Sequence, residues 1–146
     1  MKIAIVMMLI LIHIGNIGCS SSEGKHKMQN IASKQMQIYY ISPKVLTRSA
    51  VQPDVLKIDS NLVDVRPEIR SKLEQFIATV KSAKHAEIKE SLIKYDFRLC
   101  VQSDGIFYFN EYGNVVLIGD KLLSLSHEEE VQINDIYGKL DSSNKL

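Results

Sequence analysis

Histidine, cysteine and acidic side chains are the groups in this chain that could bind a metal ion or act as a nucleophile. The run 127–131, His-Glu-Glu-Glu-Val, begins like the zinc-binding helix of metalloproteases, which carries two histidines four residues apart. Val131 stands where the second histidine is needed, and the other histidines lie far away in the sequence. The acidic residues then suit the first turn of a helix, where they interact favourably with the helix dipole. We expect no metal site and no cofactor.

Cys100 is the one candidate nucleophile, and its surroundings in the sequence argue against that role. It lies within a predicted strand, two residues from Arg98 on the same face. A reactive thiolate needs a helix N-terminus or a histidine partner. The sequence also contains neither a glycine-rich phosphate loop nor a nucleophile-elbow pattern. We therefore expect Cys100 to be a buried or half-buried thiol, we name no catalytic residue, and we expect a protein that is not an enzyme.

Two polar residues and three tyrosines could form a binding surface on the predicted sheet. Asp96 and Arg98 point to the same side of a strand, as a functional polar patch or as a surface ion pair. Tyr39, Tyr108 and Tyr112 lie on or beside strands, and tyrosine is enriched at protein interfaces. These five residues are the candidate partner surface. The alternative is that the rings only cover the open face of the sheet.

The first nineteen residues have the pattern of an export signal. Met1-Lys2 gives a positive start, and residues 3–12 are all apolar. Smaller and more polar residues follow up to Cys19. This pattern is typical of a secretory signal peptide, and the apolar run is too short for a comfortable transmembrane helix.

The segment Ile17-Gly18-Cys19 resembles the end of the lipobox of bacterial lipoproteins, in which a small residue precedes the modified cysteine. The resemblance implies cleavage after Gly18 and attachment of acyl chains to Cys19, which would become the first residue. Several acyl chains together anchor a protein stably to a membrane. The alternatives are ordinary secretion after cleavage and an uncleaved anchor.

The resemblance also predicts location and domain organisation. Residues 1–18 are the signal peptide, 19–34 are the lipidated cysteine and a polar flexible tether, and 35–146 are a single domain. Ser20 follows the cysteine where aspartate would imply retention at the inner membrane. We expect an exported protein anchored by Cys19 to the periplasmic face of the outer membrane, if the host is Gram-negative.

Composition agrees with one ordinary domain. The 146 residues include 18 Lys and Arg against 17 Asp and Glu, a net charge of +1. A nearly neutral chain has no general attraction to nucleic acid, so we expect no nucleic-acid partner. With Cys19 lipidated, Cys100 would be the only remaining cysteine, and no internal disulfide could form.

Apolar periodicity predicts the elements of the domain. A stripe from Ile69 to Val80 predicts an amphipathic helix over 67–84, begun by Pro67. Ser126 and Glu129 form a capping box that opens a C-terminal helix. Residues 82–89 should be a loop, and Pro53 should mark a turn. Strands are expected at 35–42, 61–65, 92–102, 106–110, 115–118 and 121–125, and 45–51 is either a strand or an extended segment.

Short hairpin turns imply antiparallel pairing, and grouped strands with separate helices imply an α+β fold. We expect a sheet of about four to six strands with both helices on one face, above Phe107 and Phe109. The predicted function is non-catalytic binding of another envelope or periplasmic protein, as an inhibitor, an immunity-like protein or an accessory subunit. The alternative is a small-ligand carrier or sensor with a pocket between helix 67–84 and the sheet.

Overall fold

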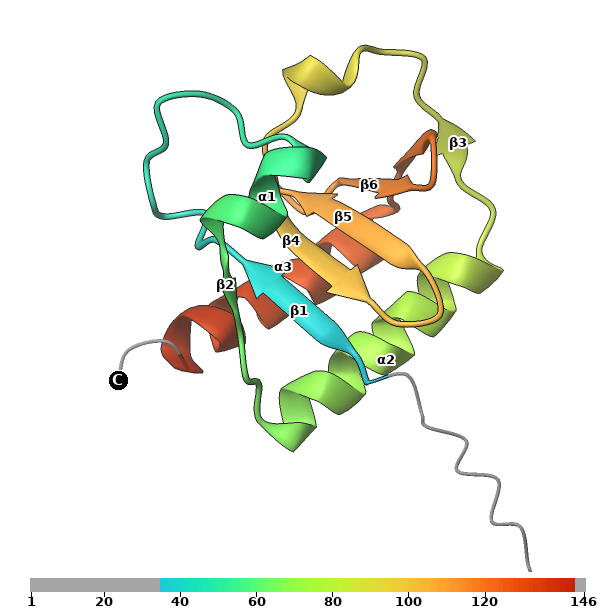
Figure 1. The fold of residues 1–146 in the computed structure, drawn as a ribbon. Coiled ribbons are helices and arrows are strands. Elements are labelled where there is room, and N and C mark those ends of the chain that lie inside the picture. The colour runs from blue at the N-terminus through green and yellow to red at the C-terminus, as the bar shows by residue number, and fades with distance from the viewer. Residues whose placement is uncertain (1–34, 144–146) are drawn as a thin grey trace, which may run out of the picture. The chain divides into compact units, whose positions relative to one another are not determined.

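Residues 35–143 are described by the computed structural model of the chain (Figure 1). The predicted signal peptide, the cleavage after Gly18, the lipidation of Cys19 and the tether all fall outside the described residues. In chain order the elements are β1 (Gln37–Tyr40), α1 (Pro53–Asp59), β2 (Asn61–Leu62), α2 (Pro67–Ser82), β3 (Ala86–Glu87), the 3-10 turn η1 (Leu92–Lys94), β4 (Phe97–Gln102), β5 (Ile106–Asn110), β6 (Val115–Ile118), β7 (Lys121–Ser124) and α3 (His127–Ser143).

The strands form one antiparallel sheet in the order β2-β1-β4-β5-β6-β7-β3. Five strands have four to six residues, and a two-residue strand borders each edge. The α+β class with an antiparallel sheet is therefore confirmed. The meander β4 to β7 follows the predicted hairpins. Its β5–β6 turn needs Gly113, which has a positive φ of 71° and leaves no room for a Cβ beside Ile133.

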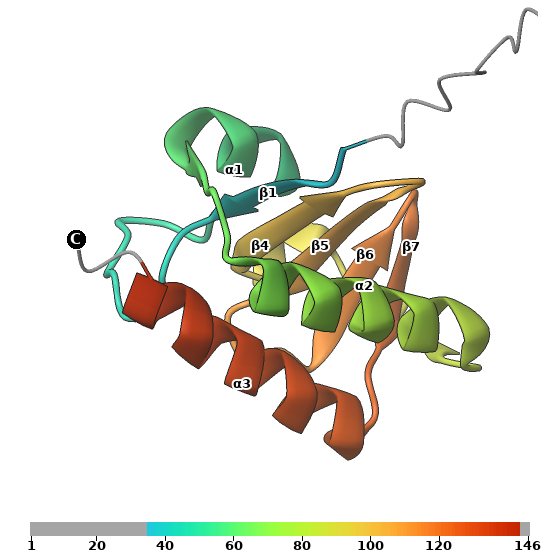
Figure 2. The same cartoon turned by 90° about the horizontal axis from the view of Figure 1, so that it is seen from below.

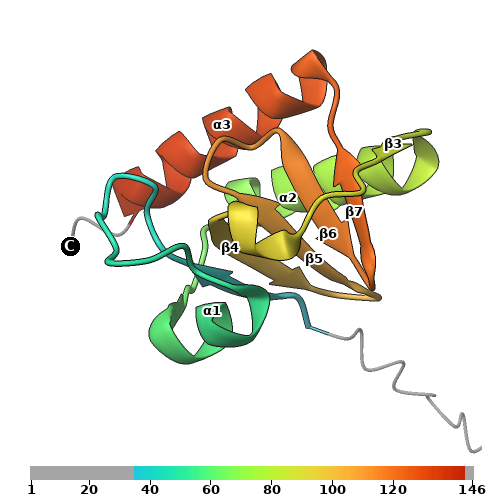
Figure 3. The ribbon, with the colours of Figure 1, turned by 90° about the horizontal axis from the view of Figure 1, so that it is seen from above.

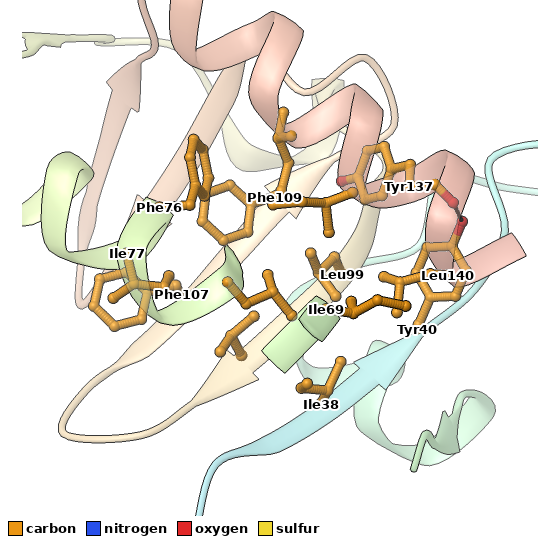
Figure 4. Close-up of a cluster of buried hydrophobic side chains, with 14 of the residues drawn as sticks. Ile38, Tyr40, Ile69, Phe76, Ile77, Leu99, Phe107, Phe109, Tyr137 and Leu140 are labelled. Carbon is orange, nitrogen blue, oxygen red and sulfur yellow. Dashed lines mark hydrogen bonds between the residues drawn. The ribbon is translucent and has the colours of Figure 1, made fainter. Parts of the chain in front are cut away.

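Helices α2 and α3 lie side by side on one face of the sheet (Figure 2). Alternation along the strands turns Ile38, Leu99, Phe107 and Phe109 towards these helices, as expected for the two phenylalanines. Figure 4 shows these side chains meeting Ile69, Phe76, Ile77, Tyr137 and Leu140. The predicted placement of both helices on one face is confirmed.

The opposite face is covered by α1 and by the segment around η1 (Figure 3). The strand residues between those of the main core point to this side and form a smaller cluster with Leu56 of α1, which we call the α1-side cluster. Its buried members are Val51, Leu56, Phe97, Cys100, Val115, Leu117 and Leu122. The face that the sequence left open is therefore covered in part.

Several predicted boundaries are wrong. Pro53 begins helix α1 instead of marking a turn, because proline also suits the first position of a helix. The strand predicted at 61–65 is only β2, and the strand predicted at 92–102 begins at Phe97 after the 3-10 turn. Residues 45–51 contain no strand, so the strand alternative is wrong for this segment, and the loop predicted at 82–89 contains β3. Two of these errors concern the edge strands β2 and β3, which are two residues long and depend on pairing with β1 and β7.

Candidate functional site

A β-bulge in β4 places Arg98 beneath an exposed loop. The pairing of β4 with β5 shifts between Phe97 and Leu99, so Arg98 is the extra residue. The shift directs Phe97 into the α1-side cluster and Leu99 into the α2–α3 core. Arg98 is only 3% exposed. A buried guanidinium needs partners, since an unpaired buried charge is strongly unfavourable.

The partners of Arg98 are Asp96 and the loop of residues 42–50, which we call the Leu46 loop (Figure 1). Nη2 of Arg98 lies 2.5 Å from Oδ2 of Asp96. Nη1 donates to the carbonyl oxygen of Val45 at 3.0 Å, and Nη2 also donates to Oγ1 of Thr47 at 3.1 Å. The two loop residues on either side of Leu46 are thus held by one guanidinium.

Both ends of the Leu46 loop are tied to β4 as well. At its start, the backbone N–H of Ile41 donates to the carbonyl of Arg98 at 2.9 Å. At its end, the N–H of Val51 donates to Oδ1 of Asp96 at 2.9 Å, and the N–H of Phe97 donates to the carbonyl of Val51 at 2.9 Å. Asp96 therefore supports Arg98 and the end of the loop together.

Lys44 ties the Leu46 loop to the C-terminal helix. Its Nζ lies 2.9 Å from Oδ2 of Asp141 in α3, and the hydroxyl of Tyr40 donates to Oδ1 of the same carboxylate at 2.7 Å. Burial raises the pKa of Asp141, but the hydrogen bonds from Ser42, Tyr40 and Lys44 outweigh this effect and leave the pKa below its usual value. Asp141 is thus ionised at neutral pH, and this ionised carboxylate holds Lys44.

The tip of the Leu46 loop is apolar and open to solvent. Leu46 is 97% exposed and Val45 is 51% exposed, although both belong to residue types that are normally buried. The support beneath them is unusual because the Nε of Arg98 has no partner among the described residues. A buried arginine with incomplete pairing is a costly way to stabilise a domain. Its clearest consequence is that Val45 and Thr47 are restrained by two hydrogen bonds from one side chain.

The structure does not bring the five predicted surface residues into one patch. Arg98 is buried and Asp96 is half-buried, so the interpretation as a surface ion pair is wrong, and the bulge at Arg98 is the reason. Tyr39 and Tyr108 are half-buried against the α1-side cluster, with Nζ of Lys57 5.7 Å from the ring centre of Tyr108. Tyr112 is 65% exposed in the β5–β6 turn.

Cys100 is fully buried, as predicted, and burial raises the pKa of its thiol to about 11. The thiolate is therefore scarce at neutral pH. Within residues 35–143, no group of histidine, cysteine and acidic side chains is arranged to hold a metal ion. A search of the same residues finds no helix long and apolar enough to cross a membrane.

A second buried polar cluster joins α3 to the segment before β3. The predicted capping box is present, since the N–H and hydroxyl of Ser126 both donate to Oε2 of Glu129 at 2.7 Å. His85 adds a contact of 2.9 Å between its Nε2 and Oε1 of Glu129. Burial raises the pKa of Glu129, but these hydrogen bonds outweigh it and lower the pKa overall. Every carboxylate oxygen is used within the fold, so this cluster is structural.

A hollow of about 500 Å³ lies beside α2, near the start of β1. Met36, Ile77 and Ala78 supply apolar surface, and Arg70 and Lys81 supply positive charge at its edge. Both cations are engaged, because Arg70 donates to the carbonyl of Met36 and Lys81 pairs with Asp104.

Sequence reasoning missed the Leu46 loop. The signal was present in the adjacent apolar pair Val45-Leu46 between Pro43 and Arg48, but it was interpreted as a strand or an extended segment. Two features of the structure show that this segment is an exposed loop and not a strand. They are the exposure of Leu46 and the hydrogen bonds from Arg98, about fifty residues further along the chain, to its two neighbours. Comparison of the chain with protein-family models, with curated proteins and with solved structures finds no match.

Proposed function

We propose that this protein is a lipid-anchored, non-catalytic protein of the cell envelope that binds another envelope or periplasmic protein through the Leu46 loop. One observation carries the proposal: Leu46 is almost fully exposed, while its two neighbours are fixed by the buried Arg98. Export and lipidation rest on the sequence of residues 1–19.

A fixed apolar tip is an efficient binding element. Burying an exposed leucine against a partner is favourable by about 1.5–3 kcal/mol. Association also costs free energy when flexible side chains and loops become ordered. Because Arg98, Asp96 and the β4 backbone already order the Leu46 loop, most of that cost is met during folding.

The position of the loop is compatible with anchoring through the N-terminus. The described chain begins at Gln35, enters β1 at Gln37 and leaves it for the Leu46 loop after Tyr40. The loop is therefore at the opposite end of β1 from the side on which a tether would join the domain (Figure 1).

Site-specific photocrosslinking in native envelopes tests the proposal. A benzophenone amino acid placed at position 46 should yield one stoichiometric protein adduct, identified by mass spectrometry. The matched control is position 131, where Val131 is 56% exposed on α3. A position-46 probe that gives no adduct beyond those of the control would refute binding through this loop.

The lipid anchor has a separate test. Cys19→Ser should abolish acyl labelling and release the protein from membranes, whereas Cys100→Ser should retain both properties. Acyl labelling of the Cys19→Ser variant would refute the lipobox interpretation.

A second candidate function, a small-ligand carrier or sensor, is supported by the hollow beside α2. Apolar side chains and both basic and acidic side chains line it, and its size suits a small organic molecule. Ligand screening by thermal shift should then raise the melting temperature, and Ala78→Glu, at an exposed position that lines the hollow, should remove the effect.

A further inference from the structure

We propose that the partner is an endopeptidase whose primary specificity pocket accepts leucine, and that the Leu46 loop blocks its cleft as a substrate-like inhibitor. This inference rests on the proposed function and names the class of partner. A peptidase cleft binds an extended segment and places one side chain in a pocket. The Leu46 loop presents one such side chain between two restrained residues.

The exposure of the loop fits this mode of binding. Residues 44–49 are all exposed, and Leu46 and Thr47 belong to neither a helix nor a strand. Leu46 is 97% exposed, so a pocket can enclose it without displacing any contact within the domain. The adjacent Val45 is half exposed and supplies a second apolar contact on the side that precedes the cleavable bond.

The support of the loop explains why it would inhibit instead of being consumed. Hydrolysis of the Leu46–Thr47 bond adds one water and creates a carboxylate and an amine. Arg98 holds the carbonyl of Val45 on one side of that bond and the hydroxyl of Thr47 on the other, at 3.0 and 3.1 Å. The ends of the loop remain bonded to β4. The two new termini therefore stay together, so they leave the cleft slowly and the bond can re-form.

Charge defines the rim of the partner's pocket. The loop carries Lys44 and Arg48, and residues 35–53 contain no acidic residue. Lys44 is 77% exposed in its side chain even though it contacts Asp141. Electrostatic complementarity mainly increases association rate and specificity. The inferred partner thus has a leucine pocket bordered by carboxylates.

Inhibition assays with two defined peptidases test the inference. The detergent-solubilised full-length protein is incubated with chymotrypsin or subtilisin, and hydrolysis of a chromogenic peptide is followed. We expect competitive inhibition and slow cleavage confined to the Leu46–Thr47 bond. The variant Leu46→Lys should weaken inhibition of chymotrypsin by about 100-fold, the effect of losing a central anchor residue, and should create inhibition of trypsin. The matched control is Ile93→Lys, since Ile93 is 72% exposed in η1 and should not matter.

The role of Arg98 is tested through cleavage rate. Arg98→Met should convert the loop into a rapidly cleaved substrate at the same bond. If that variant does not fold, Thr47→Val removes only the hydroxyl that accepts from Arg98 and should raise the rate of cleavage at the same bond. Unchanged cleavage in the folded variants would contradict the proposed role of the support.

Two further outcomes would overturn the inference. One is the absence of inhibition of both chymotrypsin and subtilisin by the wild-type protein. The other is rapid cleavage of the wild-type loop. A position-46 photoadduct with a protein that is not a peptidase would overturn the inference and leave the proposed function intact, whereas loss of any specific adduct would refute the proposed function itself.

Discussion

The two faces of the sheet are covered in different ways. Under α2 and α3, twenty buried residues form one continuous core that includes Phe76, Phe107, Phe109 and Tyr137. Under α1 and η1, the buried cluster has seven residues. Of the ten large hydrophobic residues exposed in the described chain, four lie in α1 and η1 over this second face: Val55, Ile58, Leu92 and Ile93.

The two faces therefore differ in role: one stabilises the domain, and the other presents the Leu46 loop. The α2–α3 face buries most of the apolar surface and therefore supplies most of the hydrophobic stabilisation. The α1 face instead holds a bulge, a buried ion pair and a fixed loop, which are features that restrict conformation more than they add stability. The following predictions test this division, from the largest expected effect to the smallest.

The first prediction concerns the centre of the α2–α3 core. Phe109 is fully buried and its ring centre lies 5.5 Å from that of Phe76. Phe109→Ala should lower the free energy of unfolding by about 3–5 kcal/mol, because it removes a large side chain and leaves a cavity. Chemical denaturation followed by circular dichroism measures the change. A loss below about 1 kcal/mol would mean that this face is not the principal core.

The second prediction concerns the support of the Leu46 loop. Asp96→Ala should destabilise the domain by about 3 kcal/mol, since it leaves Arg98 buried without its carboxylate. Hydrogen exchange at residues 45–51 should accelerate more than exchange in α2. Asp64→Ala, at an exposed aspartate, is the matched control and should leave both properties unchanged.

The third prediction compares two neighbouring valines of β6. Val116 is fully buried and faces the α2–α3 core, whereas Val115 is 4% exposed and faces the α1-side cluster. Val116→Ala should lower the free energy of unfolding by about 2 kcal/mol and Val115→Ala by about 1 kcal/mol. The difference is expected because a side chain in the larger core makes more contacts, and more of them are lost when it is shortened. Equal losses in denaturant titrations would remove the energetic contrast between the two faces.

The fourth prediction concerns acid stability. The pKa of Glu129 is lowered in the folded state, so its ionised form stabilises the fold above the unfolded-state pKa. That contribution disappears as the pH falls through the folded-state pKa. Wild-type stability should therefore decrease on acidification, and Glu129→Gln should weaken this decrease. Melting temperatures between pH 7 and pH 3 test it, with the exposed Glu68 as the control in Glu68→Gln.

The smallest expected effect on stability belongs to Leu46. Because this side chain is almost fully exposed, Leu46→Ala should change the free energy of unfolding by less than about 0.5 kcal/mol. The same substitution should abolish the photoadduct formed from a probe at position 45. Strong destabilisation would instead show that Leu46 belongs to the fold.

Local patterns in the sequence were sufficient for the regular parts of the domain. The apolar stripe of α2, the capping box of α3 and the alternation of β5 all arise from residues close together in the chain. Burial of Phe107 and Phe109 beneath the helices followed from the same alternation. Such signals depend only on helix and strand periodicity, which the backbone imposes everywhere.

Only the tertiary structure determined the candidate site. Helix α1 has seven residues, too few for local propensity to establish, and the packing of Leu56 against the sheet stabilises it. The bulge at Arg98 depends on pairing with β5, and the support of Val45 and Thr47 spans about fifty residues of sequence. A single sequence records which residues are apolar or charged. Which apolar residue remains exposed, and which charge is buried beneath it, is decided by contacts between distant segments.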